Sequence, residues 1–96
     1  LAMDKPPTAI FAASDVQAMG VLQAAEELGV RVPEDLAVIG FDDVEEAAVL
    51  GLTTVRQPLR ETGARGVELL LSAIEGRESP PVEELAPLAV VERRTA

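Results

Sequence analysis

The chain has 96 residues, a net charge of −9, and neither cysteine nor histidine. This length allows one domain at most, and the missing residue types exclude disulfides, thiolate zinc sites and cysteine or histidine catalysis. Phe11 and Phe41 are the only aromatic residues, so neither charge nor base stacking supports nucleic-acid binding by this segment. No apolar run approaches the roughly 18 residues of a membrane helix. The chain opens with Leu1-Ala2-Met3 rather than an initiator methionine, as expected for a piece of something longer.

The first half of the sequence predicts a strand, a helix and a second strand. Residues 9–13 form a short apolar run, typical of a strand buried on both faces. Ser14 and Gln17 then form a capping box. Apolar residues recur at helical spacing as far as Gly29, which should end the helix in a left-handed conformation. The next apolar run, 36–41, completes about thirty residues that predict a right-handed βαβ unit.

The second half predicts a short helix, a third strand, a long helix and a final strand. Asp43 resembles the N-cap of the short helix, and Gly51 should end it after roughly two turns. Pro58 suits the first turn of the long helix. The final strand, over 85–91, contains Pro87, which restricts it to a sheet edge or a bulge. This order predicts an α/β fold, a mostly parallel sheet with flanking helices.

Two polar pairs, Ser14-Asp15 and Asp42-Asp43, follow the carboxyl ends of predicted strands, which is where open parallel sheets bind ligands. All four residues could be helix caps. Capping accounts for Ser14 and Asp43, but it accounts poorly for Asp42, because Asp42 is the last strand residue and one cap suffices per helix. Asp42 is therefore the better candidate for a ligand-binding carboxylate, which could accept hydrogen bonds from vicinal hydroxyls without a metal.

A magnesium-dependent phosphotransfer site is the enzymatic alternative, because such sites combine clustered carboxylates with a lysine. The only lysine, Lys5, precedes the first strand, and no glycine spacing matches a phosphate-binding loop. We therefore expect no catalytic residue, no metal and no cofactor. Arg56 and Gln57 are polar residues between the third strand and the long helix, and an ordinary loop would also account for them.

The segment from Arg31 to Asp43, with its Val-Pro-Glu-Asp and Gly-Phe-Asp-Asp motifs, resembles the lactose-repressor/galactose-repressor (LacI/GalR) family of transcriptional regulators. Further matching segments are residues 7–15, 52–58 and 90–94. The resemblance implies a periplasmic-binding-protein-like fold similar to sugar-binding proteins. Residues 1–96 would form the C-terminal part of the effector-binding and dimerisation domain, without the helix-turn-helix and most of the N-terminal lobe.

The resemblance also implies roles for individual residues. Asp42 would grip the hydroxyls or amines of a small-molecule effector, such as a sugar or related metabolite. Ser14 would lie at the cleft wall, and Gln57 would lie near the ligand on a crossover between lobes. Asp15 and Asp43 would be structural caps near the site.

The protein implied by the resemblance is a non-enzymatic, cytoplasmic transcriptional regulator. It would sense an effector, form a homodimer, contact DNA only through its N-terminal domain and have no contact with membranes. A lobe of a periplasmic sugar-binding transport protein is the alternative. The sequence from Val-Pro-Glu-Asp to Gly-Phe-Asp-Asp and the basic residues Arg93 and Arg94 favour the regulator.

The long helix after Pro58 carries an apolar stripe made up of Leu59, Val67, Leu70, Leu71 and Ile74. In the resembled fold this helix packs in the other lobe rather than on this sheet. An uncovered apolar patch of this kind is uncommon on a soluble monomer. The family also dimerises through the face that holds the first helix and segment 44–50. We therefore expect the isolated chain to form a dimer or a larger assembly.

Overall fold

A computed structural model of the chain describes residues 4–76 and 87–96. Strands and helices alternate within these residues as β1 (Ala9–Phe11), α1 (Asp15–Glu27), β2 (Ala37–Asp42), α2 (Glu45–Leu50), β3 (Thr53–Arg56), α3 (Leu59–Ile74) and β4 (Ala89–Val91). The strands form one sheet in the order β1-β2-β3-β4, with β1, β2 and β3 parallel and β4 antiparallel to β3. The predicted α/β fold with a mostly parallel sheet is confirmed.

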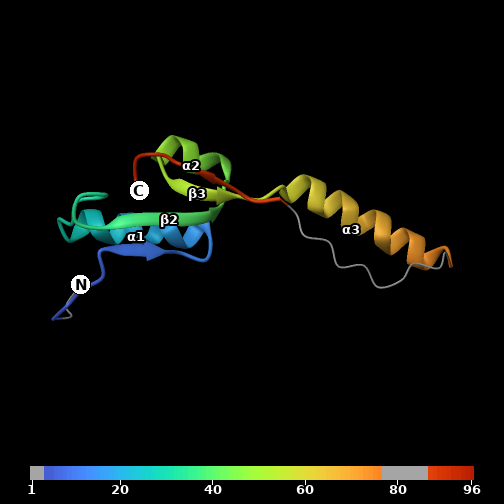
Figure 1. Cartoon of the computed structure of the whole chain (residues 1–96), viewed down its shortest axis with the longest axis horizontal. Helices are drawn as coiled ribbons and strands as arrows, with labels where there is room; N and C mark the ends of the chain where they lie inside the picture. The colour runs from blue at the N-terminus through green and yellow to red at the C-terminus, as the bar shows by residue number, and fades with distance from the viewer. Residues whose placement is uncertain (1–3, 77–86) are drawn as a thin grey trace.

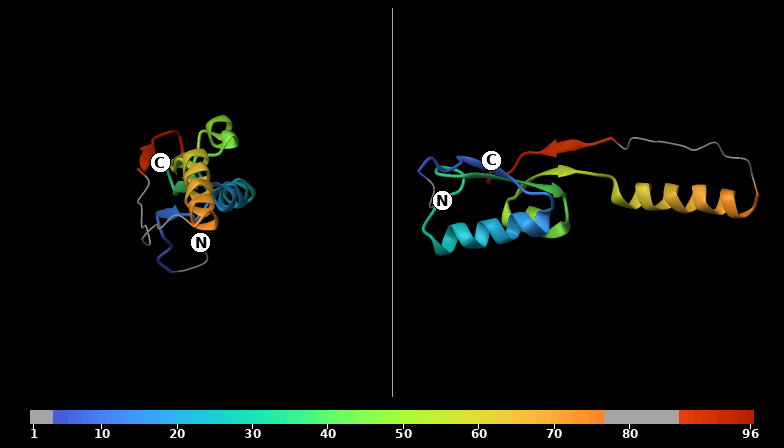
Figure 2. Two further views of the ribbon diagram at one scale, coloured as in Figure 1. Left: turned by 90° about the vertical axis from the view of Figure 1, so that its right-hand side faces the viewer. Right: turned by 90° about the horizontal axis from the view of Figure 1, so that it is seen from below.

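The first helix begins and ends as its sequence predicts. The Oγ of Ser14 accepts a hydrogen bond of 3.1 Å from the backbone N–H of Gln17, and Gly29 has a φ of 69° just after the helix. Figure 2 shows α1 and α2 on the same face of the sheet. A small apolar core lies between these helices and the sheet, and it consists of Ala12, Ala18, Leu36, Val38, Ala47 and Leu52.

Two boundaries differ from the sequence predictions. Asp43 is not the N-cap of α2: the cap position belongs to Val44, and no side chain donates or accepts a capping hydrogen bond there. The physical reason is that the Asp43 carboxylate is held by two arginines, as described below. The final strand, β4, lies at the sheet edge as predicted but begins only at Ala89. Residues 85 and 86 of the predicted strand lie outside the described residues.

The third helix lies outside the body formed by the sheet, α1 and α2. Figure 1 shows α3 projecting from the end of β3, and none of its residues is buried. The molecule is therefore elongated, with extents of 58 × 29 × 19 Å. Every residue of the predicted apolar stripe is at least 50% exposed, so the helix does not pack on this sheet, as expected. Among the described residues, no helix has the length and apolar character needed to cross a bilayer.

The segment after β4 returns into the sheet. Thr95 is completely buried, and its backbone oxygen accepts a hydrogen bond of 2.8 Å from the N–H of Val38 in β2. Its hydroxyl donates to the Val38 oxygen at 2.7 Å and accepts from the Thr53 N–H of β3 at 2.8 Å. Thr95 thus joins β2 and β3 where these strands begin, a contact that no pattern in the sequence predicts.

The exposed stripe of α3 predicts self-association of the isolated chain. Each aliphatic side chain that becomes buried between copies gains roughly 1.5–3 kcal/mol. We expect light scattering after size exclusion to give a dimer or larger species at tens of micromolar. Leu70→Glu should shift the population towards smaller species, whereas Thr62→Glu, which adds the same charge outside the stripe, should not. A monomeric parent would contradict the prediction.

Candidate functional site

A hollow of about 360 Å³ lies at the carboxyl ends of β2 and β3, at the sheet edge where open parallel sheets bind ligands. Its polar lining comes from Asp42, Asp43, Arg56, Gln57 and Glu61. The hollow also includes Pro58 at the start of α3 and Ala89, the first residue of β4.

The structure brings together two of the three residues that the resemblance implicated in ligand binding. Asp42 is the last residue of β2 and is half-buried. Its Oδ1 accepts a hydrogen bond from the Nε2 of Gln57, which follows β3. Ser14 lies at the same sheet edge, after β1, but its Oγ is engaged by Gln17 and it does not line the hollow.

The backbone of the Asp42-Asp43 turn is strained. Asp42 has a φ of 131° and Asp43 a φ of 63°, values that L-residues rarely adopt and that cost of order 1–3 kcal/mol each. Such a conformation persists only where the surrounding contacts hold it. Asp43 and Asp15 provide those contacts, one at each side of the turn.

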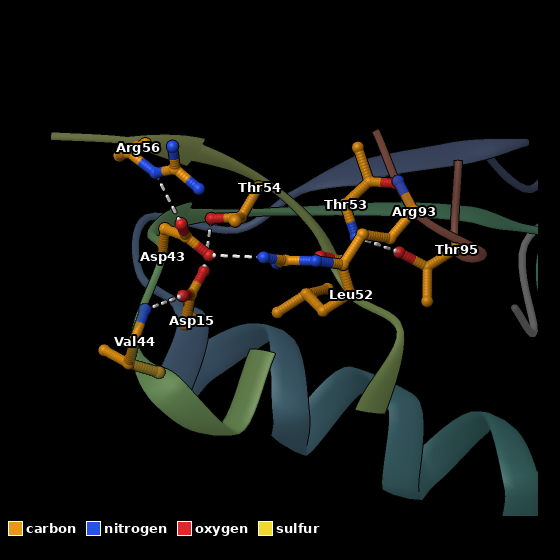
Figure 3. A network of polar contacts seen from close by, with 9 residues as sticks. All are labelled: Asp15, Asp43, Val44, Leu52, Thr53, Thr54, Arg56, Arg93 and Thr95. Carbon is orange, nitrogen blue, oxygen red and sulfur yellow. Dashed lines mark hydrogen bonds and ion pairs between the residues drawn. The ribbon is translucent and has the colours of Figure 1, made fainter. Parts of the chain in front are cut away.

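Asp43 is held by two arginines from different segments. Its Oδ2 lies 2.7 Å from the Nε of Arg56 in β3, and its Oδ1 lies 2.9 Å from the NH2 of Arg93 after β4 (Figure 3). The side chain is only 9% exposed. Burial by itself raises the pKa of Asp43, but the hydrogen bonds from Arg56 and Arg93 outweigh it and lower the pKa below its ordinary value. Asp43 therefore forms ion pairs instead of the predicted cap.

Asp15 holds the other side of the turn. It is the first residue of α1 and is completely buried. Its Oδ2 accepts a hydrogen bond of 2.8 Å from the N–H of Val44, and its Oδ1 accepts one of 2.6 Å from the hydroxyl of Thr54 (Figure 3). Its role is structural and near the site, as expected, but these bonds lead to α2 and β3 rather than to its own helix.

Gly40 explains how a carboxylate fits at this depth. A Cβ at Gly40 would collide with Oδ1 of Asp15, so only glycine leaves room for the contact between Asp15 and Thr54.

Sequence reasoning missed the structural roles of Thr54 and Arg93. A buried threonine hydroxyl beside a strand glycine was the available signal for the first, because a buried hydroxyl needs a partner. No local pattern indicated that Arg93 pairs with Asp43, because the two residues are 50 positions apart in the sequence.

Of the two carboxylates in the Asp42-Asp43 turn, only Asp42 has a neutral partner. Asp43 is neutralised by arginines, whereas Asp42 is bound by an amide, so Asp42 can accept hydrogen bonds from hydroxyl or amine groups of a ligand. Within residues 4–76 and 87–96, no group of three acidic, histidine or cysteine side chains is placed to hold a metal ion.

Comparison with known proteins identifies the family. A family profile described as a periplasmic binding protein-like domain matches residues 1–96. The chain belongs to this family, in the branch formed by LacI/PurR-type transcriptional regulators. The HTH-type transcriptional repressor PurR of Vibrio cholerae serotype O1 is 42% identical over 98 residues, which cover 99% of this chain and 29% of the relative. The chain thus spans less than a third of the length of this relative.

Solved structures give the same result. A complex of the transcriptional regulator CelR with cellobiose superposes with a TM-score of 0.85 at 34% identity, covering 93% of this chain and 28% of that one. A dimeric Lac repressor superposes with a TM-score of 0.81 at 36% identity, covering 93% and 33%. The LacI-family resemblance seen in the sequence is confirmed, and these relatives favour a regulator over a transport protein.

The contacts of Asp15 predict a large loss of stability in Asp15→Ala. The substitution leaves the Val44 N–H and the Thr54 hydroxyl without an acceptor, so the free energy of unfolding should fall by about 3 kcal/mol. Urea unfolding at fixed protein concentration measures the change. Glu34→Ala, which removes a different exposed carboxylate, should leave the free energy nearly unchanged. Equal effects of the two substitutions would contradict the assigned role.

The lowered pKa of Asp43 predicts an acid-dependent contribution to stability. Because the folded-state pKa lies below the unfolded value of about 3.9, the contribution is complete above about pH 5 and is lost as the pH falls through the folded pKa. Asp43→Asn should lower the free energy of unfolding by about 1–2 kcal/mol at pH 7. The difference from the parent should shrink progressively as the pH is lowered from 7 through the folded-state pKa. Urea titrations between these pH values test it, and a difference independent of pH would refute it.

Proposed function

We propose that this chain is the effector-sensing and dimerising segment of a LacI/PurR-type transcriptional regulator. The observation that carries the proposal is the geometry of Asp42. A half-buried carboxylate ends an inner strand of the sheet, borders a hollow, and is kept in a strained backbone conformation by contacts on both sides. Strain of this kind concentrates at ligand sites, where it fixes a functional group in place before binding.

The ligand we propose is a small, polar molecule that carries hydroxyl or amine groups. Asp42 accepts hydrogen bonds from it, and the Gln57 amide, which already contacts Asp42, orients the carboxylate and contacts the ligand itself. Ser14 lies outside the hollow at the same sheet edge, and in this proposal it extends the binding surface towards β1. Its Oγ accepts a hydrogen bond from the Gln17 N–H, which leaves the hydroxyl proton free to donate to a ligand. The cellobiose bound to CelR supports a saccharide as the first class of ligand to test.

We also propose that the chain forms a homodimer through the outer faces of α1 and α2. Apolar side chains are exposed there, including Val16 at 70%, Leu28 at 67% and Val49 at 87%. A groove of about 450 Å³ between α1 and Leu50 lies on the same side. The similarity to a dimeric Lac repressor supports a dimer, and the commonest closed assembly is a two-fold dimer.

The whole regulator would be cytoplasmic and non-enzymatic, and it would contact DNA through an N-terminal domain. The relatives are repressors, and the hollow contains no histidine, cysteine or lysine that could act as a general base or nucleophile beside Asp42.

The proposal predicts that Asp42→Asn weakens effector binding in the full-length protein. A thermal-shift screen of neutral saccharides and amines would first identify a ligand, and calorimetry would then compare affinities. Replacing the charged acceptor of a desolvated hydrogen bond should cost about 2 kcal/mol or more, roughly thirtyfold in affinity. Asp35→Asn, which changes an exposed carboxylate before the start of β2, at the opposite end of that strand from the hollow, is the matched control. Equal affinities of the parent and Asp42→Asn would refute the site.

A further inference from the structure

The hollow keeps its positive charges away from Asp42. Arg56 in β3 lies in register with Asp42 in β2, and opposite charges at paired strand positions normally attract each other. The Nε of Arg56 instead lies 2.7 Å from Oδ2 of Asp43, while Asp42 is bound by the neutral amide of Gln57. Arg56, the cation in register with Asp42, is therefore paired with the neighbouring carboxylate of Asp43.

Asp43 occupies a second guanidinium group as well. The NH2 of Arg93 lies 2.9 Å from Oδ1 of Asp43, and its NH1 donates to the Leu52 backbone oxygen at 3.0 Å. Figure 3 shows the two guanidinium groups reaching Asp43 from different sides. Two arginines that converge on one anionic group form a geometry that also binds phosphate. Here the chain's own carboxylate fills that position.

We propose that Asp43 determines the charge specificity of the hollow. Asp43 forms ion pairs with Arg56 and Arg93, so these arginines do not pair with Asp42. Asp42 can then accept hydrogen bonds from neutral or cationic ligands, and the hollow rejects anionic ligands such as phosphate esters. Glu61 in the lining and the net charge of −9 act in the same direction. This inference rests on the proposed role of the hollow as an effector site, and it adds the charge class of the ligand.

The experiment is a titration of inorganic phosphate into ¹⁵N-labelled chain at pH 7 and constant ionic strength, followed through backbone amide shifts. It compares the parent with Asp43→Asn and with the double variant Asp42→Asn/Asp43→Asn. Asparagine has nearly the same shape as aspartate and adopts positive φ about as readily, so each substitution removes charge without adding backbone strain. The double variant also prevents Asp42 from capturing the freed arginines.

We expect no saturable shift in the parent. The double variant should show saturable shifts at Gln57 and Arg93, with phosphate affinity at least about tenfold above that of the parent. Asp35→Asn is the control, because it frees Arg31 from an exposed ion pair and should produce no shift at the hollow. An osmolyte in every sample offsets any loss of stability in the variants.

Two results would overturn the inference. One is saturable phosphate binding at the hollow of the parent, which needs no variant to fold. The other is the absence of phosphate binding in both variants while their amide spectra stay dispersed. Because the probe is phosphate, neither result depends on the identity of the effector. A failure here therefore stays distinguishable from a failure of the Asp42 binding experiment.

Discussion

The buried carboxylate of Asp15 is the contact on which the arrangement of the site depends. It receives its two hydrogen bonds from Val44 and Thr54, so one side chain of α1 fixes the entry to α2 and the middle of β3. An unpartnered charge at this depth would be strongly unfavourable, which makes the fold intolerant of any other relative placement of these segments. Gly40 provides the space for it. The Asp42-Asp43 turn lies between β2 and α2, so these contacts of Asp15 fix its conformation.

The three carboxylates at the strand ends have different roles because they have different partners. Asp15 is buried with neutral donors, and Asp43 is paired with two guanidinium groups. Asp42 lines the hollow, as Asp43 does, but it accepts a hydrogen bond from the neutral amide of Gln57. Residue type alone does not separate these roles. Burial and the charge of the partner do.

The sequence predicted the features that depend on local chemistry. The capping box of Ser14, the left-handed conformation of Gly29 and the succession of strands and helices along the chain follow from side chains a few positions apart, and the structure has them. The motif from Arg31 to Asp43 indicated the family. Asp42 and Gln57 were placed near one another through that resemblance, and the structure brings them into contact.

The sequence did not predict contacts between distant segments. Asp43 looked like a cap because a carboxylate before a short helix usually is one. Its true partners include Arg93, and no local pattern links two residues so far apart. The same limit applies to Asp15, whose acceptor role depends on the glycine opposite it and on a threonine of β3. Long-range pairing of this kind is fixed by packing, which a single sequence does not display.

The burial of Thr95 between β2 and β3 has a consequence for the order in which the molecule is made. The hydrogen bond from Thr53 to Thr95 spans 42 positions, and α3 lies within that interval. During synthesis, the starts of β2 and β3 leave the ribosome well before the residue that joins them. Until Thr95 emerges, the Val38 and Thr53 amides have no such partner, and the nascent sheet exposes them to chaperones and to other chains. Contacts of such sequence separation also form slowly, which lengthens this vulnerable interval.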